Sequence, residues 1–236
     1  MNYWGGAGLY GSGEVTVMHF VKKKLEAIDA PVIFDVGANK GQYAMALAGV
    51  FTSSERIICF EPSGFAYKLL KDNLEKRGLQ ARIRAVNIGF GSQNEQVKLY
   101  GNERGTVIAS VYSRSVFTVE QDPVHTEDVQ LETIDNFCSE NKIETIHFLK
   151  LDVEGHEYAA LRGADRMLRD GRITFIQFEF GEFHIEARTF FRDFFELLNP
   201  KYQLYRIASN GLVPIRRYDA ELEVFLTANY LAERRV

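Results

Sequence analysis

Apolar residues follow two alternating patterns along the first third of the chain. Compact, β-branched runs without polar alternation are typical of strands that are buried on both faces. These runs are residues 32–36, 56–60 and 82–87. The segments beside them carry apolar residues at helical spacing and are residues 14–28, 44–51 and 63–77. Strands and helices that alternate in this way predict a parallel sheet covered by helices on both faces.

The pattern changes in the middle of the chain and then returns. Three short alternating strands without a helix predict an antiparallel β insertion at residues 95–132, and they are residues 97–100, 107–112 and 129–131. Helices are then expected at residues 133–141, 156–169 and 187–198. Strands are expected at residues 145–151, 173–180, 202–207 and 223–228, the last two around the Asn210–Gly211 turn. Together these elements give an α/β fold with seven principal sheet strands.

Length and composition favour one globular domain over residues 1–236, with residues 1–30 as an N-terminal lid and helix. The formal net charge is −4 without a basic stripe, so we expect no nucleic-acid partner. No apolar run reaches the length of a transmembrane helix, and residues 1–13 lack the pattern of a signal peptide. The two cysteines form no CxxC motif, which fits a cytoplasmic location.

A glycine-containing loop follows the first strand, with the sequence Asp35-Val-Gly37-Ala-Asn39-Lys-Gly41-Gln-Tyr43. A loop at the carboxyl edge of a parallel sheet borders the usual ligand crevice. Its G-x-x-x-G spacing differs from the dinucleotide fingerprint G-x-G-x-x-G. Asp35 at the strand end favours a cationic ligand group, such as an ammonium or a sulfonium. The alternative is a tight strand-to-helix turn with an aspartate cap.

An acidic residue, Glu61, ends the second strand. A carboxylate about 20 residues past a nucleotide-binding loop accepts hydrogen bonds from ribose hydroxyls. Pro62 stiffens the turn that aims this carboxylate, and Ser63 can cap the next helix. The alternative is a solvated acid at a helix start. After the third strand, Asn87 could approach an adenine edge or simply form a turn.

Three carboxylates and an imidazole follow the strand at 145–151, and they are Asp152, Glu154, His156 and Glu157. Mutual repulsion and partial burial would separate their pKa values, as acid–base chemistry or metal binding requires. The alternative makes Glu154 and Glu157 ordinary acids of a helix N-terminus and His156 a surface residue. Asp152 is the strongest candidate, because the end of the strand points it into the crevice.

The run 150–157, followed by Leu161-Arg-Gly163-Ala164, resembles the signature of the FkbM family of methyltransferases. The resemblance covers about residues 30–180 and, more loosely, the tail through Tyr230. It implies a class I methyltransferase fold, with a doubly wound, mostly parallel seven-stranded sheet that carries one antiparallel strand. It also implies S-adenosylmethionine as the cofactor and O-methylation of a sugar, glycan or natural-product acceptor.

The resemblance also implies a role for each site residue. The residues expected around the cofactor are Asp35, Gly37, Asn39, Gly41, Tyr43, Glu61, Pro62 and Asn87. The residues expected to face the acceptor are Asp152, Glu154, His156 and Glu179. A hydroxyl acceptor must lose a proton, so a base is expected within about 3 Å of it. The candidates are Asp152, His156 and Glu154, in that order, and no metal is expected.

Two other functions remain open from the sequence. Asp152-Val-Glu154 could be the metal site of a nucleotide-sugar transferase, although Asp35 and Glu61 would repel phosphates. The chain could also be a cofactor-binding module without catalysis.

Two aromatic groups admit two interpretations each. The N-terminal group (Tyr3, Trp4 and Tyr10) would form a lid or pack on the core, and the later group (Phe190, Phe191, Phe194 and Phe195) belongs to the core or to a homo-oligomer surface.

Overall fold

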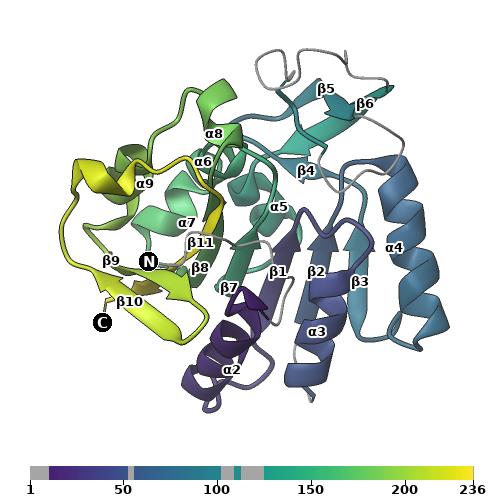
Figure 1. Ribbon diagram of the computed structural model, residues 1–236. Helices are drawn as coiled ribbons and strands as arrows, with labels where there is room; N and C mark the ends of the chain where they lie inside the picture. Colours follow the sequence, from purple (N-terminus) through teal and green to yellow (C-terminus); the bar gives the residue numbers. More distant parts are fainter. Residues whose placement is uncertain (1–10, 53–55, 102–108, 113–124, 236) are drawn as a thin grey trace.

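A sheet of eight strands forms the centre of the protein (Figure 1) in a computed structural model that describes residues 11–52, 56–101, 109–112 and 125–235. The strand order is β10-β9-β11-β8-β7-β1-β2-β3. Its strands are β1 (Val32–Val36), β2 (Arg56–Phe60), β3 (Ile83–Val86), β7 (Ile146–Leu151), β8 (Ile173–Phe180), β9 (Tyr202–Ala208), β10 (Gly211–Ile215) and β11 (Ala228–Arg234). The five strands from β8 to β3 are parallel, whereas β11 runs antiparallel to both β8 and β9.

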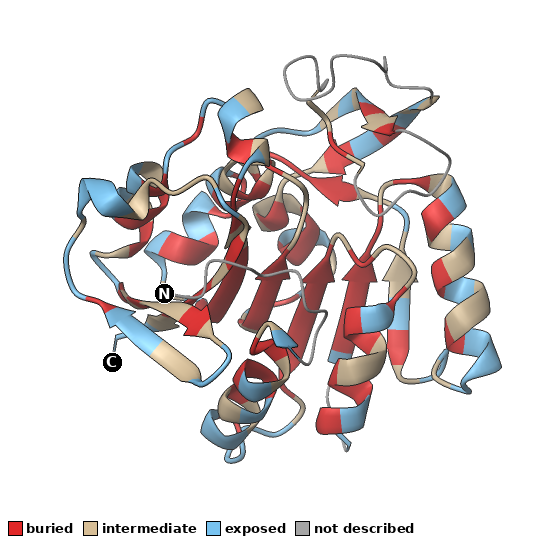
Figure 2. Ribbon diagram, viewed as in Figure 1, coloured by how far each residue is buried: buried red, intermediate tan, exposed pale blue. Residues whose placement is uncertain are grey.

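Helices cover both faces of this sheet, as the alternating pattern predicted. The helices on one face are α2 (Glu14–Lys24), α3 (Gln42–Val50) and α4 (Gly64–Lys76). The helices on the other face are α5 (Ile134–Glu140), α6 (Glu157–Arg162), α7 (Asp165–Arg169) and α9 (Phe191–Leu198). Figure 2 shows the buried residues concentrated in the central strands. All five residues of β1 are buried, which explains why its sequence shows no polar alternation.

The β insertion forms a separate three-stranded sheet with the order β4-β6-β5. Its strands are β4 (Gly89–Phe90), β5 (Glu95–Gly101) and β6 (His125–Glu132). The predicted antiparallel pairing holds for β5 and β6, whereas β4 pairs with β6 in parallel. Of the expected strand at 107–112, only residues 109–112 are described, and Ser110 forms a single bridge to Tyr100. In Figure 1 this sheet lies beyond the carboxyl ends of β1, β2 and β3.

The prediction of one continuous helix over residues 156–169 is wrong, because the helix is interrupted between α6 and α7. The carboxylate of Asp135 on α5 accepts hydrogen bonds from the N–H groups of Arg166 (2.7 Å) and Met167 (3.0 Å) and so caps a new helix. At the break, a Cβ on Gly163 would lie 2.1 Å from the carbonyl oxygen of Gly91. The glycine therefore allows α6 to end against the base of the insertion.

The C-terminal third also departs from the sequence interpretation. The strand expected at 223–228 is wrong, because β11 begins at Ala228 and the Asn210–Gly211 turn joins β9 to an additional strand, β10. Pro214 fits in β10 because this strand lies at the sheet edge and pairs only with β9. Before α9, the chain forms the short helix α8 (Phe183–Glu186) instead of helix from residue 187.

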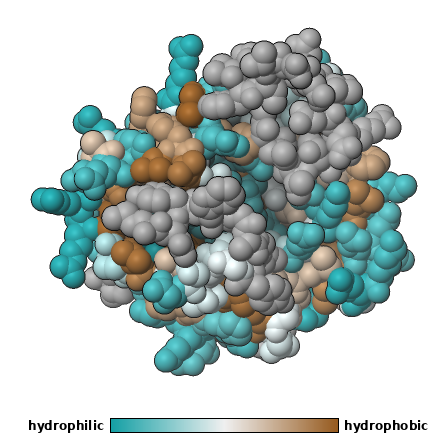
Figure 3. Space-filling model, viewed as in Figure 1, coloured by the Kyte–Doolittle hydropathy of each residue, from teal (hydrophilic) through white to brown (hydrophobic). Residues whose placement is uncertain are grey.

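Three of the four clustered phenylalanines belong to the core, which was one of the two interpretations of this cluster. Phe191, Phe194 and Phe195 are buried, whereas Phe190 is 52% exposed. On the face shown in Figure 3, hydrophobic residues lie in small groups among hydrophilic ones. None of the helices in the described part of the chain is long and apolar enough to cross a membrane. The aromatic residues Tyr3, Trp4 and Tyr10 lie outside the described residues.

Candidate active site

A cavity of about 470 Å³ lies at the carboxyl edge of the parallel strands. The loops after β1, β2 and β7 contribute to it, and so do Glu179 near the end of β8, Glu14 at the start of α2 and the insertion. Most of the predicted site residues line it: Gly37, Asn39, Tyr43, Glu61, Pro62, Asp152, Glu154, His156 and Glu179. The structure thus brings both predicted groups of residues to one crevice.

The loop after β1 is built around a close backbone approach. Gly37 has a φ of 78°, and a Cβ at this position would lie 1.8 Å from the carbonyl oxygen of Asp152. Only glycine fits, because any side chain would push the loops of β1 and β7 apart. Gly41 has a φ of 85° and precedes α3, but it does not line the cavity. Its role is to form the turn that starts the helix.

Glu61 is fixed at the end of β2 by two backbone groups. The N–H of Asn39 donates to its Oε2 (2.8 Å), and the N–H of Ser63 donates to its Oε1 (2.9 Å). The side chain is almost fully buried, yet it lines the cavity. Burial raises the pKa of the Glu61 carboxyl to about 7, against the lowering effect of the two N–H groups. Each oxygen keeps a lone pair for a further donor.

The carboxylate of Asp35 has the protein's own ammonium as its partner. Asp35 is fully buried and does not line the cavity. It is the register partner of Lys150 on β7, and Lys150 Nζ lies 3.4 Å from Asp35 Oδ1 and 3.1 Å from Asp152 Oδ2. The prediction that Asp35 contacts a cationic ligand group is therefore corrected, because Lys150 occupies that position.

Lys150 is itself buried among acids and beside an aromatic ring. Burial lowers the pKa of Lys150, but the carboxylates of Asp152, Asp35 and Glu14 raise it by more than burial lowers it. The net shift of the pKa is upward, so the ammonium stays charged. Its Nζ also lies 4.6 Å from the centre of the Tyr43 ring, a cation–π distance. The floor of the cavity thus carries a fixed positive charge that holds Asp152.

A chain of hydrogen bonds extends from this floor to α2. The hydroxyl of Tyr43 donates to Gln177 Oε1 (2.8 Å), and Gln177 Nε2 donates to Glu14 Oε1 (2.9 Å). The hydroxyl of Ser12 donates to the other oxygen of Glu14 (2.8 Å). Burial raises the pKa of Glu14 against the effect of Lys150. The start of α2 therefore belongs to the wall of the site.

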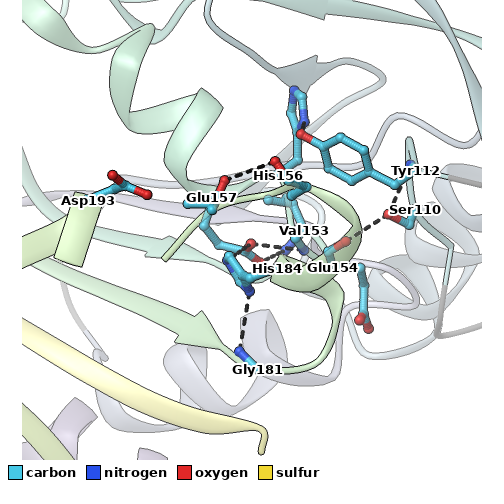
Figure 4. A network of polar contacts seen from close by, with 12 residues as sticks. Ser110, Tyr112, Val153, Glu154, His156, Glu157, Gly181, His184 and Asp193 are labelled. Atoms are coloured by element: carbon cyan, nitrogen blue, oxygen red, sulfur yellow. Dashed lines mark hydrogen bonds and ion pairs between the residues drawn. The ribbon is translucent and has the colours of Figure 1, made fainter. Parts of the chain in front are cut away.

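The acidic loop after β7 is held by a buried carboxylate, Glu157 (Figure 4). Its Oε1 accepts from the N–H of Val153 (2.7 Å), and its Oε2 accepts from the N–H of Gly155 (2.9 Å). His184 Nε2 lies 3.1 Å from Oε2, while the N–H of Gly181 donates to His184 Nδ1. Burial would raise the pKa of Glu157, but His184 and the backbone lower it overall. Glu157 therefore shapes the loop as an anion and does not face the cavity.

His156 connects the acidic loop to the insertion. Its Nδ1 lies 3.0 Å from the hydroxyl of Tyr112, and the hydroxyl of Ser110 donates to the carbonyl of Glu154 (2.7 Å; Figure 4). Its Nε2 is buried, and a Cβ on Gly91 would lie 3.2 Å from it. Burial lowers the pKa of His156, so the ring is neutral near pH 7. Nδ1 thus has a hydrogen-bond partner, and Nε2 is enclosed by the protein.

Glu179 differs from the other carboxylates at the cavity. Glu14, Glu61 and Asp152 each have a hydrogen bond or an ion pair within the protein. Among the described residues, Glu179 has no such partner. Burial and the nearby charges of Asp152 and Glu154 raise its pKa well above the usual range. Its carboxyl group therefore binds a proton more readily than an ordinary glutamate does.

The insertion closes the cavity over the ends of the strands. We call its described part (β5, residues 109–112 and β6) the roof, and eight of its residues line the cavity: Leu99, Tyr100, Gly101, Ala109, Val111, His125, Glu127 and Leu131. Glu127 accepts hydrogen bonds from Ser63 Oγ (2.8 Å) and from the N–H of Gly64 (2.8 Å) at the start of α4.

Asn87 does not reach the cavity in this structure. Its Nδ2 donates to the carbonyls of Glu61 (2.8 Å) and Pro62 (2.9 Å), and its side chain is otherwise exposed. Asn87 thus supports the turn that carries Glu61, while its position beside an adenine stays a prediction. Gly89 and Phe90, which follow it, line the cavity instead.

The sequence interpretation missed several residues, among them Glu14, Lys150, Gln177 and Glu127. Asp35, Lys150 and Gln177 are register partners on three adjacent strands. A polar residue inside each of three apolar strands was the available signal, because such a residue needs a buried partner. Glu127 gave no comparable signal. Within the described ranges, no group of three or more His, Cys, Asp or Glu side chains is arranged to hold a metal ion.

Known proteins share this fold and parts of this sequence. 2-O-methyltransferase NoeI from Sinorhizobium fredii is 25% identical over 185 residues, which cover 74% of this chain and 73% of NoeI. Methyltransferase sdnD from Sordaria araneosa is 26% identical over 158 residues, which cover 57% of this chain and 61% of sdnD. The match to sdnD therefore spans less than two thirds of that relative.

Solved structures of methyltransferases have the same fold. Methyltransferase FkbM from Methylobacillus flagellatus superposes with a TM-score of 0.52 at 18% identity, over 86% of this chain and 43% of that one. The O-methyltransferase from Bacillus cereus in complex with SAH gives 0.51 at 14% identity, over 93% and 81%. These likenesses confirm the class I methyltransferase fold. The family described as Methyltransferase FkbM domain matches residues 35–207. Since that match covers well over half of the sequence, this chain belongs to the FkbM methyltransferase family.

Proposed function

We propose that this chain is an S-adenosylmethionine-dependent O-methyltransferase that acts on a hydroxyl of a sugar, glycan or natural product. One observation carries the proposal. A single cavity joins Glu61, at the end of β2, to Asp152 and Glu179, at the ends of β7 and β8 on the other side of β1. The first carboxylate suits ribose hydroxyls, and the other two suit an acceptor that must lose a proton.

The residues present fit the proposed cofactor. The cavity volume lies within the range of small-molecule sites, about 300–1,000 Å³. Glu61 would hold the ribose through its free lone pairs, with Phe90 and Leu131 as apolar surface nearby. Bound S-adenosylmethionine supplies a methyl group that its sulfonium has already activated. The solved relative from Bacillus cereus, which contains SAH, supports this assignment.

Glu179 is our candidate for the base that takes the acceptor proton. Its carboxylate lines the cavity without a hydrogen-bond partner among the described residues, and its raised pKa suits proton uptake. Asp152 is held by Lys150 at 3.1 Å and is better suited to orient the acceptor. His156 is a weaker candidate for the base than either carboxylate. Its Nδ1 contacts the hydroxyl of Tyr112, and its Nε2 is buried against Gly91.

The nature of the acceptor is inferred from the cavity wall and from one relative. The acceptor side carries carboxylates, tyrosine and histidine, which are suited to hydroxyl groups. The relative NoeI is described as a 2-O-methyltransferase, which supports transfer to oxygen.

Calorimetric titration with S-adenosylhomocysteine tests the cofactor, with a nucleotide sugar and NADH as controls. We expect S-adenosylhomocysteine to bind and the two controls not to bind, because Glu61 and Glu127 would repel phosphates at the start of α4. Transfer of a labelled methyl group to a panel of hydroxylated acceptors then tests the reaction. Binding of the nucleotide sugar alone would instead favour a glycosyl transferase.

A further inference from the structure

Glu127 and Glu61 both line the cavity and both bind the turn at residues 63–64. The N–H of Ser63 donates to Glu61, while the hydroxyl of Ser63 and the N–H of Gly64 donate to Glu127. Glu61 belongs to the end of β2, whereas Glu127 belongs to the roof. Among the described residues, Glu127 is the roof side chain that is hydrogen-bonded to the start of α4.

We propose, on the basis of the proposed function, that Glu127 couples the ribose end of the cavity to the roof. A ligand whose hydroxyls bind Glu61 would thereby hold the roof more tightly over the acceptor side. Glu127 is a positioning residue in this scheme, because it acts through the turn and through Glu61.

The coupling follows from the electrostatics of the shared turn. Two carboxylates held by neighbouring donors repel each other, and the partly buried location weakens solvent screening. Burial, Glu127 and Asp35 all raise the pKa of Glu61. Hydroxyl donors on Glu61 would disperse its charge and so reduce the repulsion that Glu127 experiences. A ligand shifts a conformational equilibrium only by such a difference in interaction between states.

The roof can transmit this effect because it is paired along its length and attached at its far end. β6, which carries Glu127, pairs with β5 from Glu95↔Leu131 to Gly101↔His125. At the far end, Ser110 and Tyr112 contact the acidic loop at Glu154 and His156. A tighter contact at Glu127 therefore restrains strands that reach the acceptor side. By linkage, the acceptor would also strengthen cofactor binding.

Hydrogen exchange with S-adenosylhomocysteine as the probe tests the coupling. The key variant is Glu127→Gln, which keeps the shape and removes the charge. The matched control is Asp128→Asn, because Asp128 is the next residue on β6 and, among the described residues, its exposed carboxylate pairs with Lys98 alone. At equal saturation, the ligand should slow amide exchange in β5 and β6 severalfold in wild type and in the control. It should slow exchange clearly less in Glu127→Gln.

A second readout is the pH dependence of S-adenosylhomocysteine affinity. Wild-type affinity should fall as pH decreases through about 7, because Glu61 becomes protonated. Among the described residues, the charged side chains that act on the Glu61 carboxyl are Glu127 from β6 and Asp35 from β1. Removing the Glu127 charge should move the midpoint to lower pH, whereas Asp128→Asn should not move it. A merely structural role of Glu127 would leave this midpoint unchanged.

The outcomes separate the two proposals. Equal protection of β5 and β6 in wild type and Glu127→Gln, with the same pH midpoint, would overturn the coupling alone. No binding of S-adenosylhomocysteine to wild type would overturn the proposed function and the coupling together. If Glu127→Gln does not fold, Ser63→Ala removes the Ser63 hydroxyl bond to Glu127 from the other side and should also reduce the protection. Undiminished protection in that variant would again overturn the coupling.

Discussion

Lys150→Met removes the ammonium between Asp35 and Asp152 and leaves an unbranched apolar side chain in its place. Asp35 is fully buried, and Lys150 is its cation at 3.4 Å. Asp152 is partly exposed, so water can solvate it after the change. The expected loss of stability therefore comes mainly from Asp35. Removing one partner of a buried ion pair costs about 3–5 kcal/mol, because the other charge stays buried without compensation.

The pH dependence of this loss identifies its cause. Burial already raises the pKa of Asp35 against the effect of Lys150, so removal of Lys150 must raise it further. The folded variant then takes up a proton that the unfolded chain, with an aspartate pKa of about 4, does not hold near neutral pH. A raised pKa in the folded state contributes stability at low pH that is lost as pH rises. The deficit relative to wild type should therefore be largest at pH 8 and shrink towards pH 4.

Urea unfolding of four proteins measures the effect: wild type, Lys150→Met, Asp35→Asn and the double variant. The double variant leaves no buried charge uncompensated, so it should recover about 2 kcal/mol relative to Lys150→Met. A loss below about 1 kcal/mol at pH 8 would contradict the reasoning, given the range expected for a broken buried pair. A deficit that is the same at pH 5 and pH 8 would contradict it equally.

Three further predictions concern the site itself. Glu61→Ala should weaken S-adenosylhomocysteine binding in calorimetry by about 1–3 kcal/mol, the cost of lost hydrogen bonds to a charged group, and unchanged affinity would refute the ribose assignment. Glu179→Gln should lower kcat by roughly 10²-fold or more with unchanged affinity for S-adenosylhomocysteine, and full activity would return the role of base to Asp152. Gly37→Ala should lower both the melting temperature and the ligand affinity, since its Cβ would meet a backbone oxygen at 1.8 Å; a wild-type melting curve would show that the two loops can separate.

The sequence predicted the centre of the fold well because burial on both faces leaves a clear apolar run. β1, β2, β7 and β8 lie close to their expected ranges. β10 was missed because its central residues Val213 and Pro214 are exposed at the sheet edge, where burial imposes no pattern. The break between α6 and α7 depends on Asp135, which lies far away along the chain. Such caps cannot be found from local spacing.

The candidate site likewise has a part that the sequence predicted and a part that it did not. Glu61, Asp152 and Glu179 were placed at one crevice because the carboxyl ends of parallel strands meet at one edge. The partner of Asp35 could not be identified, because it depends on the register between β1 and β7. The contact between Glu127 and Ser63 likewise joins a strand of the insertion to the start of α4. Strand ends can thus be predicted from sequence, whereas side-chain partners require the three-dimensional structure.

The insertion leaves the core and returns to it at neighbouring points. β4 pairs with the last residues of β6, and the N–H of Gly91 donates to the carbonyl of Glu132 (2.9 Å). A segment whose two ends already lie together can change in length at little entropic cost to the rest of the fold. The segment between these points is therefore a natural unit for exchange between relatives. Chimeras that keep Gly91, Glu132 and the Glu127 contact would test whether this segment sets the acceptor preference.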